Sequence, residues 1–210
     1  MLKTSLQGCV LSIGVLFLVG CGTGEIVPLD LRAIEPPAVP IRDRVKVAIT
    51  TFEDARSETG VGVEQARIGL RTHLAGGETY FVVNGGKLGP AVSKVMADYL
   101  TKRGLEAWVA TPADSRTPDI RIDGRVREYR STAKSHFGWT ELVVLTKVDV
   151  DAINLADQST VRMTLNGQKQ DVKVVFDTRD LERLMNEALD DSFKEFLKDT
   201  RIADRRMGFK

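Results

Sequence analysis

Apolar and polar residues alternate along three long stretches in the second half of the chain. These stretches cover residues 119–130, 139–155 and 160–176. In the first, Ile120, Ile122 and Val126 fall on one side and charged residues on the other. A period of two is typical of strands that bury one face. We therefore expect three long antiparallel strands whose second face is polar and open to water.

The third stretch changes phase in the middle. Its apolar positions first fall at Val161, Met163 and Leu165, and then at Val172, Val174 and Phe176. The change occurs at Asn166-Gly167, a pair that favours a break in regular strand structure. We expect a β-bulge or kink there that returns the later apolar residues to the core.

Two other stretches have the period of a helix. In 90–103, the apolar residues Val92, Val95, Met96, Tyr99 and Leu100 fall on one face. Pro90 suits the first position of this helix and Gly104 its C-terminal cap. The second stretch begins at Asp177 or Thr178, both good N-caps, ends at Asp199 and has a broad apolar stripe.

Shorter patterns predict the remaining strands. Residues 45–51 and 105–110 have the pattern of buried strands, and 66–74 with 79–83 suggest a hairpin around Ala75-Gly76-Gly77-Glu78. Together these elements predict an α+β fold, an α/β sandwich. It would have an antiparallel-rich mixed sheet of about four to five strands, with two helices packed on one face.

The N-terminus has the pattern of an export signal. Lys3 precedes a twelve-residue apolar run, 9–20, which is shorter than the roughly 20 residues of a membrane-spanning helix. The run ends in Gly20-Cys21, which resembles the lipobox of bacterial lipoproteins. That resemblance implies cleavage between Gly20 and Cys21 and acylation, such as palmitoylation, of Cys21. The alternatives are a plain signal peptide or a short uncleaved anchor.

The signal divides the chain into a signal peptide at 1–20, a lipidated N-terminus and tether at 21–44, one domain at 45–200 and a basic tail at 201–210 that frays. Four prolines favour an extended tether: Pro28, Pro36, Pro37 and Pro40. The alternative is that Ile26, Leu29 and Leu31 pack along the domain.

Charge and cysteine content narrow the function. Cleavage would remove one charged side chain, Lys3, and leave 29 basic and 29 acidic residues. A formally neutral chain argues against a general nucleic-acid binder. Cys9 would leave with the signal and Cys21 would carry the lipid, so we expect no disulfide.

Catalytic and metal-binding patterns are weak. Glu53 and Asp54 follow the first strand of the domain and could form an acid/base or cation site. Neighbouring residues on a strand point to opposite faces, so a shared site would require a turn; the alternative is a loop of ion pairs. His73 and His136 are far apart in sequence and lack a metal-ligand spacing, so we expect no metal and no cofactor.

Arginines gather on the polar side of the first long strand. Arg121, Arg125 and Arg127 share this side and could bind a phosphorylated or acidic envelope partner. The alternative is a solvated face on which they pair with Asp149 and Asp151 of the next strand. Phe137 and Trp139 lie at the turn between the two strands, where exposed aromatic rings would suit a contact with protein or lipid; the alternative is that this tip packs on the domain.

The order of elements resembles the YajG-like family of bacterial envelope lipoproteins. More distantly, it is similar to modules of curli-secretion and penicillin-binding-protein-activator lipoproteins. The segments that carry this resemblance are 45–49, 52–56, 100–104 and the last helix with Leu189, Asp190 and Phe196. The resemblance implies an outer-envelope lipoprotein without an established chemistry. Gly22, rather than Asp, after the cysteine resembles a signal for sorting to the outer membrane.

The sequence therefore predicts a non-enzymatic accessory or scaffold protein, lipid-anchored on the periplasmic face of the outer membrane. It would bind another envelope protein or assemble with itself. A second hypothesis is a carrier or chaperone that holds a lipid or glycan between helix and sheet. A third is a hydrolase built on Glu53 and Asp54.

Overall fold

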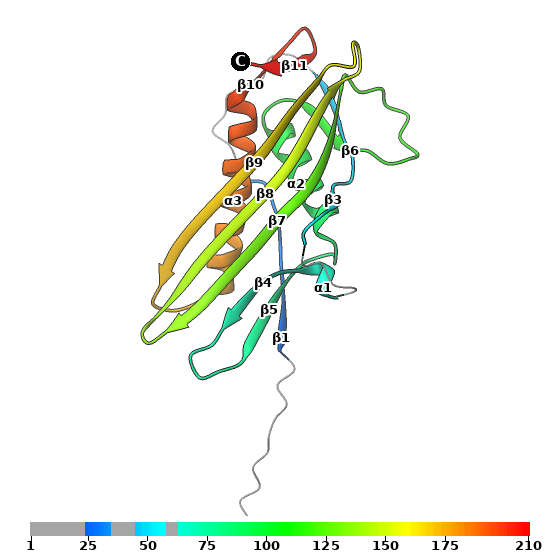
Figure 1. Cartoon of the computed structure of the whole chain (residues 1–210). Helices are drawn as coiled ribbons and strands as arrows, with labels where there is room; N and C mark the ends of the chain where they lie inside the picture. Colours follow the sequence, from blue (N-terminus) through cyan, green and yellow to red (C-terminus); the bar gives the residue numbers. More distant parts are fainter. Residues whose placement is uncertain (1–23, 35–44, 58–62) are drawn as a thin grey trace, which may run out of the picture.

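The computed structural model describes residues 24–34, 45–57 and 63–210 (Figure 1). The predicted signal peptide and Cys21 lie outside these residues. The strands of a nine-stranded sheet are β1 (Glu25–Leu29), β2 (Lys46–Ile49), β3 (Glu53–Asp54), β4 (Arg67–Thr72), β5 (Glu78–Val83), β6 (Glu106–Val109), β7 (Ile120–His136), β8 (Trp139–Asn154) and β9 (Thr160–Lys173). The helices are α1 (Val63–Ala66), α2 (Leu88–Lys102) and α3 (Thr178–Asp199), and β10 (Thr200–Ala203) pairs with β11 (Arg206–Phe209).

Strand β7 is the centre of the sheet. Along one side it pairs antiparallel with β8, which in turn pairs with β9. Along its other side it pairs parallel with β2, β3 and β4 in succession. Strand β6 lies beyond β2, while β5 and then β1 lie beyond β4. Between Val126 and Glu128 the register of β7 against β8 shifts, which marks a β-bulge in β7.

The predicted α/β sandwich with a sheet of four to five strands is wrong, because the structure is mostly β, with a large mixed sheet of nine strands. The local pattern showed the antiparallel strands β7, β8 and β9. It did not show the parallel pairings of β4 with β7 and of β1 with β5, which join segments about 50 or more residues apart. Such pairings need no turn between the strands and leave no local signal.

The helices α2 and α3 lie next to each other against the sheet, and the core fills the space beneath them. The rings of Tyr99 on α2 and Phe193 on α3 are 5.5 Å apart, and both side chains are fully buried. Asp177 caps α3 by accepting a hydrogen bond of 2.9 Å from the backbone N–H of Arg179. Gly104, with a φ of 93°, follows α2 as the predicted C-terminal glycine.

No bulge interrupts β9 at Gly167, contrary to the prediction. The strand pairs with β8 in unbroken register from Thr160 to Lys173. Gly167 is required by packing instead: a Cβ there would collide with the carbonyl oxygen of Ala188 on α3. Because the register continues, Val172 and Val174 do not return to the core and are 55% and 82% exposed.

The segment after the predicted lipidation site joins the sheet. Strand β1 runs parallel to β5, and Leu29 is buried. Beyond β1, the side chain of Asn186 on α3 accepts a hydrogen bond of 2.9 Å from the backbone N–H of Arg32. Of the three residues in the alternative interpretation, Leu29 and Leu31 therefore pack on the domain, whereas Ile26 is 51% exposed. Residues 35–44 lie outside the structure described.

The C-terminal tail is also ordered, which corrects the prediction that it frays. Strands β10 and β11 form a hairpin, and Met207 is buried. The side chain of Asn154 donates a hydrogen bond to the carbonyl of Met207 and accepts one from its N–H, both 2.8 Å long. Of the helices described, none combines the length and apolar character needed to cross a bilayer.

Candidate functional site

The three arginines predicted as a binding face lie together on β7, and each has an acidic partner. Arg121 lies 3.2 Å from Asp123 on the same strand. Arg125 reaches Glu53 on β3 through its Nε at 2.8 Å, and Arg127 reaches Asp149 on β8 at 2.7 Å. The pairs of Arg125 and Arg127 follow from the strand pairings, because they join adjacent strands.

Arg125, Arg127 and the three acidic partners line an open groove of about 690 Å³ across β3, β7, β8 and β9. Arg162 on β9 contributes a further pair, with its Nε 3.3 Å from Asp151 on β8. The groove passes over Gly124, where a Cβ would meet the ring of Phe52 at 2.5–2.7 Å. A glycine is therefore needed at this point for the Phe52 ring to pack under β7.

Charges of opposite sign alternate in the groove. Three arginines line it, Arg125, Arg127 and Arg162, with four carboxylates, Glu53, Asp123, Asp149 and Asp151; Asp123 pairs with Arg121, which lies outside the lining. The arginines are between 45% and 79% exposed, so water screens each pair and each contributes little to stability. The surface therefore presents alternating charge instead of the positive patch that an acidic or phosphorylated partner would need.

Asp149 is the most connected carboxylate of the groove. Burial raises its pKa, whereas hydrogen bonds from Arg127 and Thr164 lower it, and the balance lies below the ordinary value. The Oγ1 of Thr164 donates to Oδ1 of Asp149 at 2.8 Å, and Arg127 donates to Oδ2. Because ionisation is favoured, Asp149 accepts hydrogen bonds and is poorly suited to donate a proton near neutral pH.

Glu53 and Asp54 do not form a shared acid/base site. They are consecutive residues of β3 and point to opposite faces of the sheet. Glu53 lines the groove, whereas Asp54 accepts hydrogen bonds of 2.8 and 2.7 Å from Arg56. Arg56 also donates to the carbonyls of Gln65 and Arg67, so this pair supports the connection between β3 and β4.

The aromatic tip between β7 and β8 is exposed. Phe137 is 91% exposed and Trp139 is 38% exposed. The ring of His136 stacks on Trp139 with centroids 3.9 Å apart, and His73 shares a hydrogen bond of 2.8 Å with Thr79. Among the described residues, no group of three or more His, Cys, Asp or Glu side chains is placed to hold a metal ion.

Sequence reasoning missed three further exposed apolar side chains near this tip, Leu74, Val174 and Val175, which are 63%, 82% and 78% exposed. For the two valines, the change of phase along 160–176 was the sequence signal. Where apolar residues move to outward-facing positions near the end of a strand, either a bulge turns them back to the core or they stay exposed to water. The structure shows the second outcome.

Comparison with solved structures supports the fold. The chain is similar to a protein of Xanthomonas campestris from the DUF330 family, with 13% identity, a TM-score of 0.53, and coverage of 82% of this chain and 92% of that one. An uncharacterized protein gives 9% identity and a TM-score of 0.50 over 84% of this chain and 97% of its own. A PelC variant from Paraburkholderia phytofirmans, crystallised as a dodecamer, gives 17% identity and a TM-score of 0.39 over 76% and 94%.

No family model matches the chain, and no curated protein matches it. At these identities the similarity concerns the fold alone. The chain thus has the same general fold as a protein of the DUF330 family, while the resemblance to YajG-like lipoproteins remains a prediction from sequence.

Proposed function

We propose that this chain is a bacterial lipoprotein, acylated at Cys21 and held on the periplasmic face of the outer membrane. Its domain acts without catalysis, as an accessory that binds another envelope protein or a second copy of itself. The pattern of residues 1–22 supports the anchor. The start of β1 agrees with such an anchor, because the strand begins only four residues after Cys21 and a lipid there would hold the domain close to the membrane.

The observation that carries the binding role is the open groove beside the free edge of β9. Strand β9 pairs with β8 along one side, and within the described residues its other edge has no strand partner. It is fourteen residues long. A long edge strand presents backbone N–H and C=O groups to which another chain can pair, and the groove adds side chains that can select that chain.

The same geometry disfavours the two alternatives. A hydrolase built on Glu53 and Asp54 would need both carboxylates on one substrate, but they lie on opposite faces of β3. A carrier that holds its cargo between helix and sheet would need space there. Fully buried side chains such as Met96, Tyr99 and Phe193 occupy this region, whereas the groove is polar and lies on β3, β7, β8 and β9.

Photocrosslinking in the living cell tests the binding role. We would place a photoreactive residue at Arg162, in the groove, and a control at Lys94 on the exposed side of α2. The full chain should crosslink at position 162 to one defined protein or to itself, and not at position 94. Equal crosslinking at both positions, or none at either, would contradict the proposal.

A charge exchange separates binding from folding. In the double variant Arg127→Asp/Asp149→Arg the ion pair is kept but its direction across the groove is reversed. The domain should retain its circular dichroism and thermal midpoint, while crosslinking from position 162 should decrease. Unchanged crosslinking would show that the partner does not contact the groove.

The anchor is tested separately by labelling with palmitate. The natural chain and a Cys9→Ser variant should incorporate label, and a Cys21→Ser variant should not. Labelling that survives the loss of Cys21 would refute the anchoring part of the proposal.

A further inference from the structure

Exposed apolar side chains gather at one end of the sheet. We call this the apolar end and define it by Leu74, Phe137, Trp139, Val174 and Val175. Four of the five are at least 63% exposed, and Trp139 is 38% exposed. Single exposed apolar residues are ordinary on protein surfaces, but a group from separate segments at one end marks a contact surface.

Strand register places these residues at the same end. Thr72 of β4 lies beside Lys134 of β7, so the β4–β5 turn that carries Leu74 lies near the end of β7. Thr140 of β8 pairs with Lys173 of β9, so Val174 and Val175 follow β9 close to the β7–β8 turn. In Figure 1 these turns and the end of β9 lie together at the bottom of the sheet.

Strand β1, the first strand of the sheet, begins at this same end. Glu25, the first residue of β1, lies beside Thr79, which follows the β4–β5 turn. Cys21 is four residues earlier, and four residues of fully extended chain span at most about 14 Å. The backbone of Cys21, which would carry the lipid, therefore cannot be farther than this from the first residue of β1.

We propose that the apolar end docks on the surface of the bilayer that holds the acylated Cys21, with its side chains in the interfacial layer of the membrane. This inference rests on the proposed lipid anchor and adds an orientation to it. The sheet stands on the membrane with β7, β8 and β9 pointing away, so that the free edge of β9 extends toward the periplasm. Trp139 suits this position, because tryptophan is enriched where a membrane meets water.

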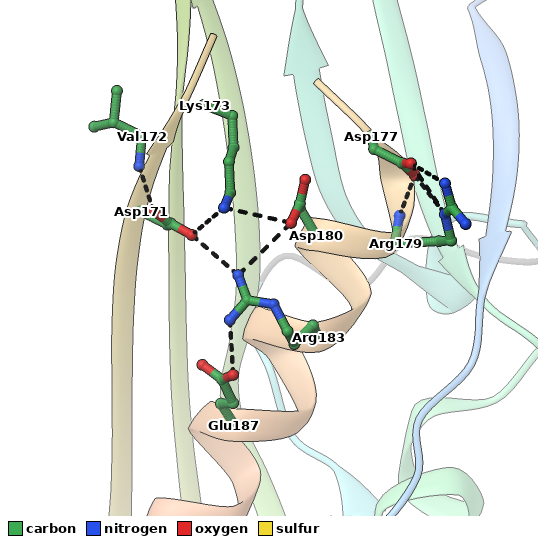
Figure 2. A network of polar contacts seen from close by, with 8 residues as sticks. All are labelled: Asp171, Val172, Lys173, Asp177, Arg179, Asp180, Arg183 and Glu187. Atoms are coloured by element: carbon green, nitrogen blue, oxygen red, sulfur yellow. Dashed lines mark hydrogen bonds and ion pairs between the residues drawn. The ribbon is translucent and has the colours of Figure 1, made fainter. Parts of the chain in front are cut away.

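The segment that carries Val174 and Val175 is fixed at both ends. Figure 2 shows a network of ion pairs that joins the end of β9 to the first turns of α3. Lys173 lies 3.1 Å from Asp171 and 3.5 Å from Asp180, and Arg183 contacts both of these carboxylates. Because this loop is already ordered, little conformational entropy is lost when the valines enter the interface.

The two tryptophans of the chain provide the test and its internal control. Trp139 lies at the apolar end, whereas Trp108 on β6 is in register with Ala48 of β2, which pairs with Arg121 at the start of β7. Fifteen residues of β7 separate the two positions, a distance of about 50 Å along a strand. Trp108→Phe leaves Trp139 as the only tryptophan, and Trp139→Phe leaves Trp108.

Each full-length single-tryptophan protein is purified from cells fed labelled palmitate and reconstituted into vesicles of phosphatidylethanolamine and phosphatidylglycerol. Matched vesicles carry bromine on the acyl chains, which quenches nearby tryptophan. We expect brominated lipid to quench Trp139 and to leave Trp108 unchanged. Replacing Phe137, Val174 and Val175 by serine should restore the emission of Trp139, whereas Phe209→Ser, at an exposed site on β11, should not.

Equal emission of Trp139 in both kinds of vesicle overturns the inference. When the protein carries the palmitate label, that result leaves the anchor in place and refutes only the orientation. A protein without label refutes the anchor and the orientation together. Crosslinking of position 137 to a protein, with Trp139 unquenched, would show that a protein covers the apolar end in place of lipid.

Discussion

Gly167 gives the sharpest test of how the helical layer meets the sheet. Replacing glycine by alanine in an ordinary strand restricts the unfolded chain and stabilises a protein by about 0.4–1 kcal/mol. At Gly167, however, the new methyl group would collide with the carbonyl oxygen of Ala188 and lie 2.5 Å from Oγ1 of Thr146. The carbonyl oxygen of Ala188 is part of the backbone of α3, so rotation of a side chain cannot relieve the overlap.

The helix must therefore move away from β9 by more than 1 Å to restore an ordinary contact of about 3.5–4 Å. This movement loosens the buried face of α3, including Leu189 and Phe193. Overpacking of a core costs about 1–3 kcal/mol, and we expect about 3 kcal/mol because the obstacle is backbone. With an m-value of about 2 kcal/mol/M, the urea midpoint should fall by about 1.5 M.

Urea unfolding followed by circular dichroism measures this change, with Gly208→Ala as the matched control. Gly208 lies in β11, and a Cβ there meets nothing within 4 Å. This control should match or slightly exceed the stability of the natural chain. If Gly167→Ala unfolds within about 0.5 kcal/mol of the natural chain, the close approach of α3 to β9 is not what requires glycine.

Three further outcomes are expected. Asn154→Leu should leave the N–H and C=O of Met207 without partners, destabilise the chain by about 2–4 kcal/mol and increase hydrogen exchange in the C-terminal hairpin, as followed by mass spectrometry. The pKa of Asp149 is below its unfolded value of about 3.9, so the ionised carboxylate stabilises the fold above that pH, and this contribution is lost as the pH falls through the folded pKa. The difference in unfolding free energy between the natural chain and Asp149→Asn should therefore shrink in acid; a difference that stays constant with pH would contradict this. Hydrogen bonds from Arg116 lower the pKa of Asp114 to about 2; NMR titration should find this value, and Arg116→Gln should raise it.

The elements of this fold could be predicted wherever the signal is local. The helix expected at 90–103 is α2 at Leu88–Lys102, and the long strand expected at 139–155 is β8 at Trp139–Asn154. Strand β1 could not be recognised. It is five residues long, contains Pro28 and pairs with a strand about fifty residues later. Pro28 is tolerated there because, among the strands described, β1 lies at the edge of the sheet and pairs with β5 alone.

The candidate site shows the same division between local and distant information. The shared side of Arg121, Arg125 and Arg127 followed from the period of the strand. The pairing of Arg127 with Asp149 also followed, as the alternative of ion pairs between neighbouring strands. The partner of Arg125 did not, because Glu53 joins the groove only through the parallel pairing of β3 with β7. The exposure of Val174 was missed for another reason. A change of phase in sequence does not tell whether the backbone bends to follow it, and in β9 the close packing of α3 on Gly167 keeps the strand regular.

The parallel alignment of β1 with β5 has a mechanical consequence. A pull on the N-terminal end of β1 is directed along the strand, so it loads the ladder from Glu25–Thr79 to Leu29–Val83 in shear. All the cross-strand hydrogen bonds must then yield together, whereas a perpendicular pull would open them one after another. The buried Leu29 and the hydrogen bond from Arg32 to Asn186 lie behind this ladder and reinforce it. The pairing of β1 with β5 is thus arranged to resist a force applied along the strand at its N-terminal end.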